Sequence, residues 1–431
     1  MAKAAPRHAS ELVGRGSPDS DLSPDELREI VEEALVDIGP GAKVLAIVPD
    51  KTRDDNTELL FAFAAKFLGE RNVAKFDALV AQGTHGVMSS EEKAAKLGVG
   101  DGVTIPGLGQ VFEHHWSDPE ALVKIGELSA ERVVEITGGL YSKAIPLQIN
   151  RLLTPGLYDH VLIFGATVPH EVAGFAGGAK YFFPGVAGPE LTHATHWLGA
   201  LAGIENTIGR IETPTRHLIE AAAEFVTANI ICFTTVVSRG DGERLRTYGL
   251  FAGDYRPSLR AAAEISRHVH IKYTGRKYQR VVAVLDEHYE ELWLGGKASY
   301  KLGGIIEPGG ELIIYAPKLY CFSQTHGEMI ERYGYNVIEQ MRELVAESGE
   351  LEENLCVAAH LAHVAFAGRQ NEAGEIVPRY RITLASQIDE AMCHKVNLGY
   401  LDFRTFNLDD YRDSETLIVD RAGRDLYLVA A

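Results

Sequence analysis

Short apolar segments alternate along the chain with longer segments in which apolar residues recur every three or four positions. The short segments have the length and composition of buried strands, and they span residues 43–48, 76–81, 160–164 and 229–236. The longer segments predict helices near residues 57–69, 188–203 and 213–227. Strands that alternate with helices are typical of a parallel, doubly wound α/β sheet. We therefore expect ligand-binding residues beyond the carboxyl ends of the strands.

The N-terminal residues carry a different pattern. Residues 1–22 are small, polar and charged, so we expect them to form a flexible tail. A helix should follow, because Ser23 and Glu26 have the spacing of a capping box and Pro24 stands at the first helical position. Its apolar periodicity continues to about Asp37.

The second half of the chain repeats the alternation. A helix near 257–270 and the polar stretch 274–280 mark a boundary, after which a new α/β unit begins at Val281. Its predicted strands are 281–285 and 311–315, and its predicted helices lie near 290–303, 326–346 and 352–367.

These patterns predict two α/β domains with mostly parallel, doubly wound sheets and an active site in the interdomain cleft. The N-terminal catalytic and cofactor-binding domain spans 23–275, and the C-terminal α/β domain spans 281–411. The last strands, within about 412–431, are candidates to rejoin the first domain.

Composition narrows the class of protein. A chain of 431 residues exceeds what one hydrophobic core usually serves. With 60 acidic and 42 basic residues, the net charge is −18, which argues against binding to nucleic acid or to anionic membranes. The four cysteines form no CxxC pair, and neither an apolar leader nor a membrane span is evident. We therefore expect a cytoplasmic protein.

Polar motifs follow the predicted strands. In the PDKTRDD motif, Arg53 offers a planar fork to a carboxylate or phosphate, and Asp50 is placed to orient it or to bind a ribose hydroxyl. The alternative is a solvated loop in which Asp55, Asn56 or Thr57 caps the next helix. In the QGTHG motif, the flanking glycines expose His85 for proton transfer, unless it only bonds to its own turn.

The segment 170–196 is the richest in chemistry. It holds a candidate general base (His170), a glycine pair that permits close approach by a ligand (Gly177 and Gly178), a lysine (Lys180), and two histidines three residues apart (His193 and His196). A single histidine near a helix start is usually structural, but the whole cluster points to function. The segment matches no zincin, P-loop or dinucleotide-binding motif.

A further motif, WLGGK, ends in Lys297, which can bind an anion or lie on the surface of an amphipathic helix. Several other histidines are interpreted as packing residues or lack obvious chemical partners: His114, His115, His326, His360 and His363.

Taken together, four motifs in this order resemble the nickel-dependent lactate racemase family, whose enzymes use a nickel-pincer nucleotide. They are PDKTR, GTH, H-x9-K-x15-H with its GFAGGAK and PG elements, and WLGGK. The resemblance extends from about residue 40 onward. It implies a 2-hydroxyacid racemase in which His85 and His170 act as acid and base on opposite faces of the substrate, while a hydride moves to and from the cofactor.

The resemblance also implies how cofactor and substrate are held. Lys180 matches a lysine that can attach covalently to the cofactor, and His196 matches the nickel ligand, with His193 as its neighbour. Arg53 and Lys297 match a cationic pair near substrate and cofactor. Asp50, Gly177 and Gly178 are further predicted cofactor-binding residues. Other proteins must synthesise the cofactor.

The chain departs from the lactate enzymes at two points. Trp293 and Leu294 replace a Tyr-Gln pair, and Asp54 stands where a proline commonly follows the TR pair. Trp293 and Leu294 make that side of the predicted substrate site more apolar, so we expect a short aliphatic or aromatic 2-hydroxyacid, with lactate among the candidates. Two alternatives stay open: a non-catalytic protein that stores the nickel nucleotide, and a zinc-dependent hydrolase using His170 and His196.

Overall fold

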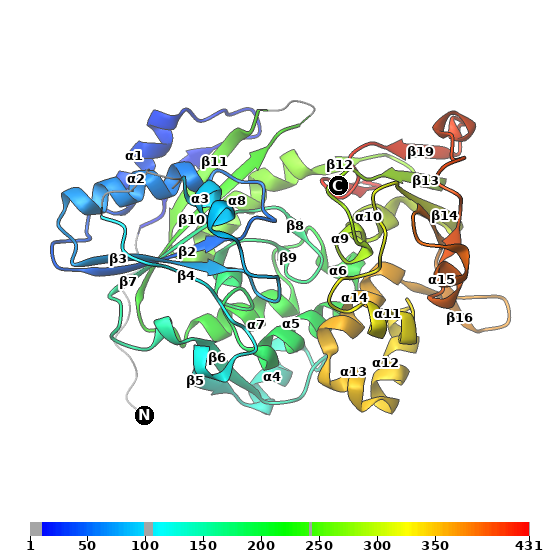
Figure 1. Ribbon diagram of the computed structural model, residues 1–431, viewed down its shortest axis with the longest axis horizontal. Coiled ribbons are helices and arrows are strands. Elements are labelled where there is room, and N and C mark those ends of the chain that lie inside the picture. The colour runs from blue at the N-terminus through cyan, green and yellow to red at the C-terminus, as the bar shows by residue number, and fades with distance from the viewer. Residues whose placement is uncertain (1–10, 99–106, 241–243, 431) are drawn as a thin grey trace. The chain divides into compact units, whose positions relative to one another are not determined.

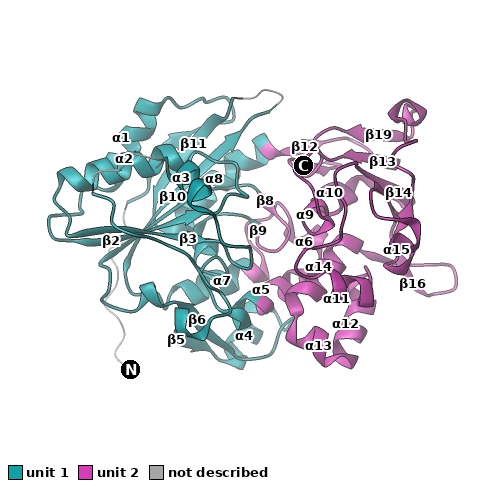
Figure 2. Ribbon diagram, in the orientation of Figure 1, with its two compact units in different colours: residues 1–168, 175–192, 216–269 teal, residues 169–174, 193–215, 270–431 magenta. Residues whose placement is uncertain are grey.

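The computed structural model describes residues 11–98, 107–240 and 244–430. The chain divides into two compact units (Figure 2). Unit 1 comprises Met1–Val168, Phe175–Thr192 and Arg216–Val269, and unit 2 comprises Pro169–Gly174, His193–Thr215 and His270–Ala431. Each unit contains a mostly parallel sheet with helices, so the predicted α/β class is confirmed.

Within its described residues, unit 1 is built on a seven-stranded sheet (Figure 1). In sheet order the strands are β1 (Val13–Gly16), β11 (Arg246–Gly253), β10 (Asn229–Ser238), β7 (His160–Ala166), β2 (Lys43–Pro49), β3 (Lys75–Ala81) and β4 (Val111–Phe112). The run from β10 to β4 is parallel, and β11 is antiparallel to it. The edge strand β1 is antiparallel to β11 and therefore runs in the same direction as β10.

The central strands are buried on both faces, which explains their continuous apolar sequence. Along β2, Val44, Ala46 and Val48 pack in the core beneath helices α1 and α2, while Leu45 and Ile47 are buried on the other face. The helices that lie wholly or partly in unit 1 are α1 (Pro24–Ala34), α2 (Thr57–Glu70), α3 (Ser90–Leu97), α4 (Ala130–Thr137), α5 (Pro189–Ala202), α7 (Pro214–Ala223) and α8 (Tyr255–His270). The predicted capping box of α1 is present.

The strand order determines where the loops of unit 1 gather. The chain passes from β2 to its neighbour β3 and later returns to the other side of β2 as β7. The order therefore reverses at β2, and such a switch point leaves a crevice at the carboxyl edge of a parallel sheet. The segments that follow Pro49, Ala81 and Ala166 start at this edge.

The expected N-terminal tail is shorter than predicted. Residues 1–10 lie outside the described part of the chain, but β1 pairs with β11 from Val13 onward. A Cβ on Gly14 would lie 2.1 Å from the Leu250 oxygen, and one on Gly16 would lie 2.4 Å from the Gly249 Cα. These glycines therefore serve close strand packing, although in the sequence they suggest flexibility.

Within its described residues, unit 2 is built on a five-stranded parallel sheet. In sheet order its strands are β18 (Gly399–Tyr400), β17 (Arg381–Ser386), β14 (Ile306–Ala316), β13 (Tyr278–Val284) and β19 (Thr416–Val419). The last strands do not return to unit 1. Instead β19 adds its apolar residues beside Val281–Ala283 of β13, and β20 (Leu426–Leu428) pairs with β12 (Ile271–Tyr273).

The helices of unit 2 are shorter than their sequence patterns predict. The expected helix 290–303 is divided at Gly296, and the expected helix 326–346 is interrupted at Gly334, which has a left-handed φ of +68°. The helices and helical turns are α6 (Ile204–Thr207), α9 (Leu292–Gly295), α10 (Lys297–Leu302), η4 (Gly303–Ile305), α11 (Gly327–Tyr333), α12 (Ile338–Glu347), α13 (Gly349–Glu353), α14 (Leu355–Ala365), α15 (Glu390–Lys395) and η5 (Leu408–Tyr411).

Smaller elements complete the described chain. The short strand pairs are β5 (Leu122–Leu128) with β6 (Ile145–Asn150), β8 (Pro169–His170) with β9 (Gly174–Phe175), and β15 (Gly368–Gln370) with β16 (Ile376–Pro378). The 3-10 turns outside unit 2 are η1 (Pro119–Ala121), η2 (Arg151–Leu153) and η3 (Gly178–Tyr181). In the part of the chain that the structure describes, no helix has the length and apolar character needed to cross a membrane.

The pairing of β1 predicts a stability effect. Gly14 has a φ of +119° and no space for a Cβ, so Gly14→Ala should lower the free energy of unfolding by about 1–3 kcal/mol. Gly39→Ala is the matched control, since a Cβ there would meet nothing within 4 Å. Urea unfolding followed by circular dichroism would measure both variants. Equal stability of the two would show that β1 does not contribute to the folded unit.

Candidate functional site

An aspartate–histidine pair stands at the carboxyl edge of the sheet in unit 1. Asp50 follows β2 directly, and His85 lies in the turn after β3. Because β2 and β3 are parallel neighbours, their following loops meet, and Asp50 Oδ2 lies 2.6 Å from His85 Nδ1. The turn is held by the Gly83 amide, which donates to the Gly185 oxygen at 3.0 Å. A Cβ on Gly83 would meet nothing within 4 Å, so the space around this turn is open.

The environment of Asp50 keeps its carboxylate ionised. Burial alone would raise the pKa of Asp50, but the hydrogen bond from His85, the nearby charge of Arg53 and the Thr52 hydroxyl hold this pKa well below its usual range. An ionised Asp50 accepts a hydrogen bond from His85 Nδ1–H, which fixes the tautomer of the neutral imidazole. The other ring nitrogen, Nε2, is then a proton acceptor. The side chain of His85 is 36% exposed, so this nitrogen can receive a ligand.

Arg53 places a positive charge near the Asp50 carboxylate. The carboxylates around it are occupied: Asp54 pairs with Arg239 at 2.7 Å, and buried Asp55 pairs with Lys96 at 2.7 Å. Among the described residues, the half-buried Arg53 side chain makes no hydrogen bond or ion pair. The loop therefore offers a guanidinium to an anionic ligand. Asp55 also accepts the Thr57 amide at the start of α2, as the solvated-loop alternative anticipates.

Lys180 lies on η3, which contacts both β2 and β7. Tyr181, the next residue, is within electrostatic reach of Asp50 and Arg53. The Gly185 oxygen that follows η3 holds the His85 turn. Unit 1 therefore brings Lys180 to the same edge as the aspartate–histidine pair.

The glycine loop before Lys180 (residues 174–178) is held by hydrogen bonds from a buried arginine. The side chain of Arg216 is fully buried, and its guanidinium donates to the Gly177 oxygen at 3.2 Å and to the Phe175 oxygen. A Cβ on Gly177 would lie 2.8 Å from Thr167 Oγ1, and one on Gly178 would lie 3.1 Å from the Leu259 side chain. The two glycines thus allow close packing within the protein, and their predicted contact with a cofactor stays a prediction.

His170 belongs to unit 2, and its local hydrogen bonds differ from those of His85. It lies on β8 and is buried. The Val172 amide donates to His170 Nδ1 at 3.1 Å, so the neutral imidazole carries its proton on Nε2. The Glu171 carboxylate lies 3.4 Å from the same Nδ1 and can stabilise the protonated ring. The two predicted catalytic histidines are thus held in opposite tautomers, one accepting and one donating through Nε2.

The histidine pair of α5 also belongs to unit 2, and its members have different surroundings. His193 Nδ1 accepts the Cys356 amide at 3.3 Å, in the first turn of α14. His196 lies one turn further along α5, within electrostatic reach of His360. His193 thus helps to hold the start of α14, and its predicted role as a neighbour of the metal ligand stays a prediction. The ligand role of His196 is itself untested.

Trp293 contacts His326 and His360, neither of which is predicted as a site residue from the sequence. Its ring stacks on His360, with centroids 4.1 Å apart, and lies 4.7 Å from the ring of His326. Burial lowers the pKa of His360 to about 3, so this ring is neutral near pH 7. Its Nε2 is buried and has no hydrogen-bond partner in the described chain. The sequence offered no signal for this cluster, because its members come from three separate segments.

Leu294 and Lys297 complete the predicted set in unit 2. Leu294 is half-buried on α9. Lys297 begins α10, and its Cβ lies 3.4 Å from the position of a Cβ on Gly423. Gly423 follows β19, which lies beside β13 in the sheet. The strand order of this sheet reverses at β13. Lys297 therefore stands at the carboxyl edge of its own sheet.

Some buried polar atoms at the edge of unit 1 are left unsatisfied. In the described chain, Gln82 Oε1 after β3 and Thr167 Oγ1 after β7 have no hydrogen-bond partner. An unpaired buried polar atom costs about 1–3 kcal/mol, so this edge is suited to a polar ligand. Across the described residues, no group of three or more His, Cys, Asp or Glu side chains is arranged to hold a metal ion.

The structure thus sorts the predicted residues between the units. Unit 1 brings together Asp50, Arg53, His85 and the turn that carries Lys180, and unit 2 carries His170, His196, Trp293, Leu294 and Lys297. Sequence reasoning missed the bond from Asp50 to His85 and the anchoring role of Arg216. The first could have been inferred from the adjacency of the two strands, but a buried arginine that binds carbonyl oxygens leaves no motif.

Comparisons with known proteins find one family model and solved structures that are similar to this chain. Residues 25–209 match the family model of the lactate racemase N-terminal domain. A crystal structure of a protein from Thermotoga maritima is similar with a TM-score of 0.84 and 33% identity, covering 94% of this chain and 98% of that one. The lactate racemase apoprotein from Thermoanaerobacterium thermosaccharolyticum shares the fold with a TM-score of 0.68 and 17% identity, over 99% of this chain and 96% of that one. No curated protein matches the chain.

The family model covers the part of the chain that holds Asp50, His85, Lys180 and His196. The racemase apoprotein has the same α/β fold over nearly the full length of both chains. Residues 25–209 of the chain belong to the family of lactate racemase N-terminal domains.

Proposed function

We propose that this protein is a racemase of 2-hydroxyacids that uses a nickel-pincer nucleotide. The observation that carries the proposal is the Asp50–His85 pair beside Arg53. Arg53 supplies a cation for a carboxylate, and His85 Nε2 accepts the proton of a neighbouring hydroxyl. A 2-hydroxyacid presents a carboxylate and a hydroxyl on adjacent carbons, so it matches both groups.

The residues present fit the nucleotide cofactor. Unsatisfied Gln82 and Thr167 at the carboxyl edge suit a polar ligand, the Lys180 amine can form a covalent bond to it, and an imidazole such as that of His196 is a suitable nickel ligand. When bound, the group takes up and returns a hydride at C2 of the substrate. Cofactor-synthesis proteins must act before this one, and we infer that they share its cytoplasmic compartment.

The chain itself binds the substrate and moves protons. Arg53 and Lys297 hold the substrate carboxylate, and His85 Nε2 removes the hydroxyl proton as C2 becomes planar. Asp50 stabilises the resulting imidazolium. The imidazolium form of His170, stabilised by the Glu171 carboxylate beside Nδ1, returns a proton from Nε2 to the substrate oxygen and is left as the neutral ring. Because one histidine starts as acceptor and the other as donor, the pair can serve both directions of the reaction.

For the substrate side chain we propose a short aliphatic or aromatic group. Half-buried Leu294 replaces the polar amide of the lactate enzymes. The Trp293 ring is held in place by its stacking on His360, so it forms a rigid wall. Each methylene buried against such a surface contributes about 0.8 kcal/mol.

The first test is activity with and without the two histidines. The protein, expressed with the cofactor-making enzymes, should racemise lactate, 2-hydroxybutyrate or phenyllactate in a chiral chromatography assay. His85→Gln and His170→Gln should each lower kcat by about 100-fold or more, since each removes a general acid or base. His115→Gln is the control, because His115 is exposed and lies outside the proposed site. Cofactor binding without turnover on any 2-hydroxyacid would instead identify a storage protein.

A second test addresses Asp50. Asp50→Asn should lower kcat by about 100-fold, because the neutral amide neither fixes the His85 tautomer nor stabilises its charged form. Asp54→Asn makes the same chemical change in a carboxylate that pairs with Arg239 and should keep nearly full activity. Steady-state kinetics of both variants, with folding checked by circular dichroism, would decide. Similar activities would remove Asp50 from the mechanism.

A third test addresses substrate choice. Leu294→Gln should lower the ratio of kcat/KM for 2-hydroxybutyrate over lactate by about fourfold, which corresponds to one buried methylene. Leu294→Met keeps an apolar side chain of similar volume and should preserve the ratio. A wild-type protein that strongly prefers lactate, or a dicarboxylate such as malate, would contradict the proposed substrate class.

A further inference from the structure

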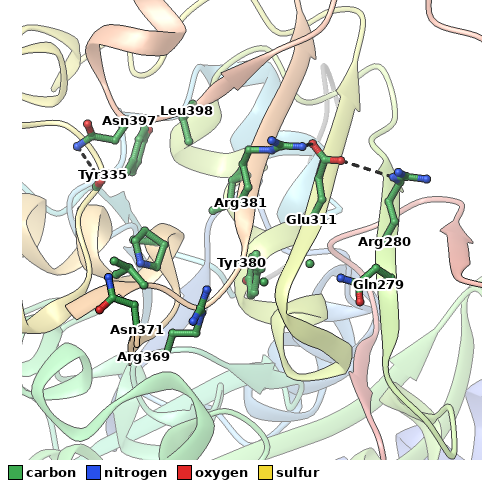
Figure 3. A pocket seen from close by; sticks show the side chains of 16 residues that line it. Gln279, Arg280, Glu311, Tyr335, Arg369, Asn371, Tyr380, Arg381, Asn397 and Leu398 are labelled. Atoms are coloured by element: carbon green, nitrogen blue, oxygen red, sulfur yellow. Dashed lines mark hydrogen bonds and ion pairs between the residues drawn. The ribbon is translucent and has the colours of Figure 1, made fainter. Parts of the chain in front are cut away.

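A cavity in unit 2 lies away from the residues considered so far. It has a volume of about 620 Å³. Residues from the amino-terminal parts of β13, β14 and β17 and from the β15–β16 hairpin are among those that line it (Figure 3). Small-molecule sites have volumes of roughly 300–1,000 Å³. Lys297 stands at the opposite, carboxyl edge of the same sheet. The cavity is therefore separate from Lys297, and none of the residues predicted for the reaction lines it.

The cavity is lined by three arginines and one acidic side chain, Glu311. Glu311 is already occupied: Arg381 donates to it at 2.8 and 3.0 Å, the Thr383 hydroxyl donates at 2.6 Å, and Arg280 lies 3.5 Å away. Figure 3 shows Arg381, Glu311 and Arg280 joined in one row. Glu311 therefore has no capacity left to neutralise a third arginine.

Arg369 is that third arginine. It lies on β15, apart from the row of ion pairs in Figure 3. Within the described residues its side chain makes no hydrogen bond or ion pair, and the same holds for the side chain of Gln279, which lines the cavity from β13. Arg369 is exposed, so a ligand can reach its guanidinium from solvent. Arg369 and Gln279 together supply donors for an oxyanion.

The remaining wall is suited to an apolar body. Tyr380 is buried, and its ring position is fixed because its hydroxyl lies 3.0 Å from the Ser299 hydroxyl. Val377 on the hairpin and Ile382 on β17 add aliphatic surface. Mostly apolar walls with a few placed polar groups are characteristic of sites for small organic ligands.

We propose that this cavity binds a small organic anion, whose phosphate or carboxylate head pairs with Arg369 and whose ring or apolar body lies against Tyr380 and Val377. The site has no acid–base pair like that of Asp50 and His85 among its lining residues, so it binds the anion and performs no chemistry on it. The proposal is independent of the racemase reaction.

The test is isothermal titration calorimetry of the full chain with phenyl phosphate, benzoate and inorganic phosphate. Saturable binding of either ring-bearing anion, tighter than that of inorganic phosphate, is expected, and the tighter of the two identifies the head group. Arg369→Gln should weaken this binding by at least tenfold. Arg342→Gln is the matched control, since Arg342 is exposed in the same unit and does not line the cavity.

Two further variants test whether the anions bind in this cavity and not at Arg53. Val377→Trp fills the cavity and should abolish binding of the ring-bearing anions. Arg53→Gln should leave that binding unchanged, because Arg53 lies at the sheet edge of unit 1. The proposal is overturned if neither ring-bearing anion binds, if Arg369→Gln and Arg342→Gln behave alike, or if Arg53→Gln removes the binding.

Discussion

The hydrogen bond between Asp50 and His85 is the interaction on which the proposed chemistry depends. It exists because two parallel neighbouring strands end at the same edge of a sheet, which brings together residues 35 positions apart in sequence. The bond does two things at once. It keeps the carboxylate ionised despite burial, and it leaves Nε2 of the neutral His85 ring as a proton acceptor. The hydrogen bond to the ionised carboxylate offsets part of the free-energy cost of burying it, and it also gives His85 one defined tautomer.

The carboxylates that follow Arg53 in this loop are also paired. Asp54 and Asp55 each have their own cation, which leaves Arg53 available for an anion. Beneath them, Arg216 binds two backbone oxygens of the glycine loop that leads to Lys180. An arginine so deeply buried is costly to place and strongly destabilising to remove. Its presence shows that the position of this loop is closely constrained.

Much of the fold could be predicted from sequence, because it rests on local signals. The capping box of α1 and the apolar runs of the central strands specify their own structure. The predictions of local structure were wrong where tertiary packing determines the conformation of the chain. Gly14 suggested a flexible tail but permits close strand pairing, and the break at Gly334 divides a periodic segment into two helices. The motifs of the proposed site are evident in the sequence. The stacking of Trp293 on His360 is not, because side chains from distant segments meet there.

The central claim is that this chain inverts a 2-hydroxyacid by hydride transfer, with His85 and His170 moving only the hydroxyl proton. The most direct measurement uses substrate deuterated at C2, incubated in ordinary water with the cofactor-loaded full chain. The account predicts that both enantiomers keep deuterium at C2 throughout racemisation, because that hydrogen never becomes an exchangeable proton. Loss of deuterium to solvent at the rate of racemisation would show that a base removes the C2 proton, and would contradict the account.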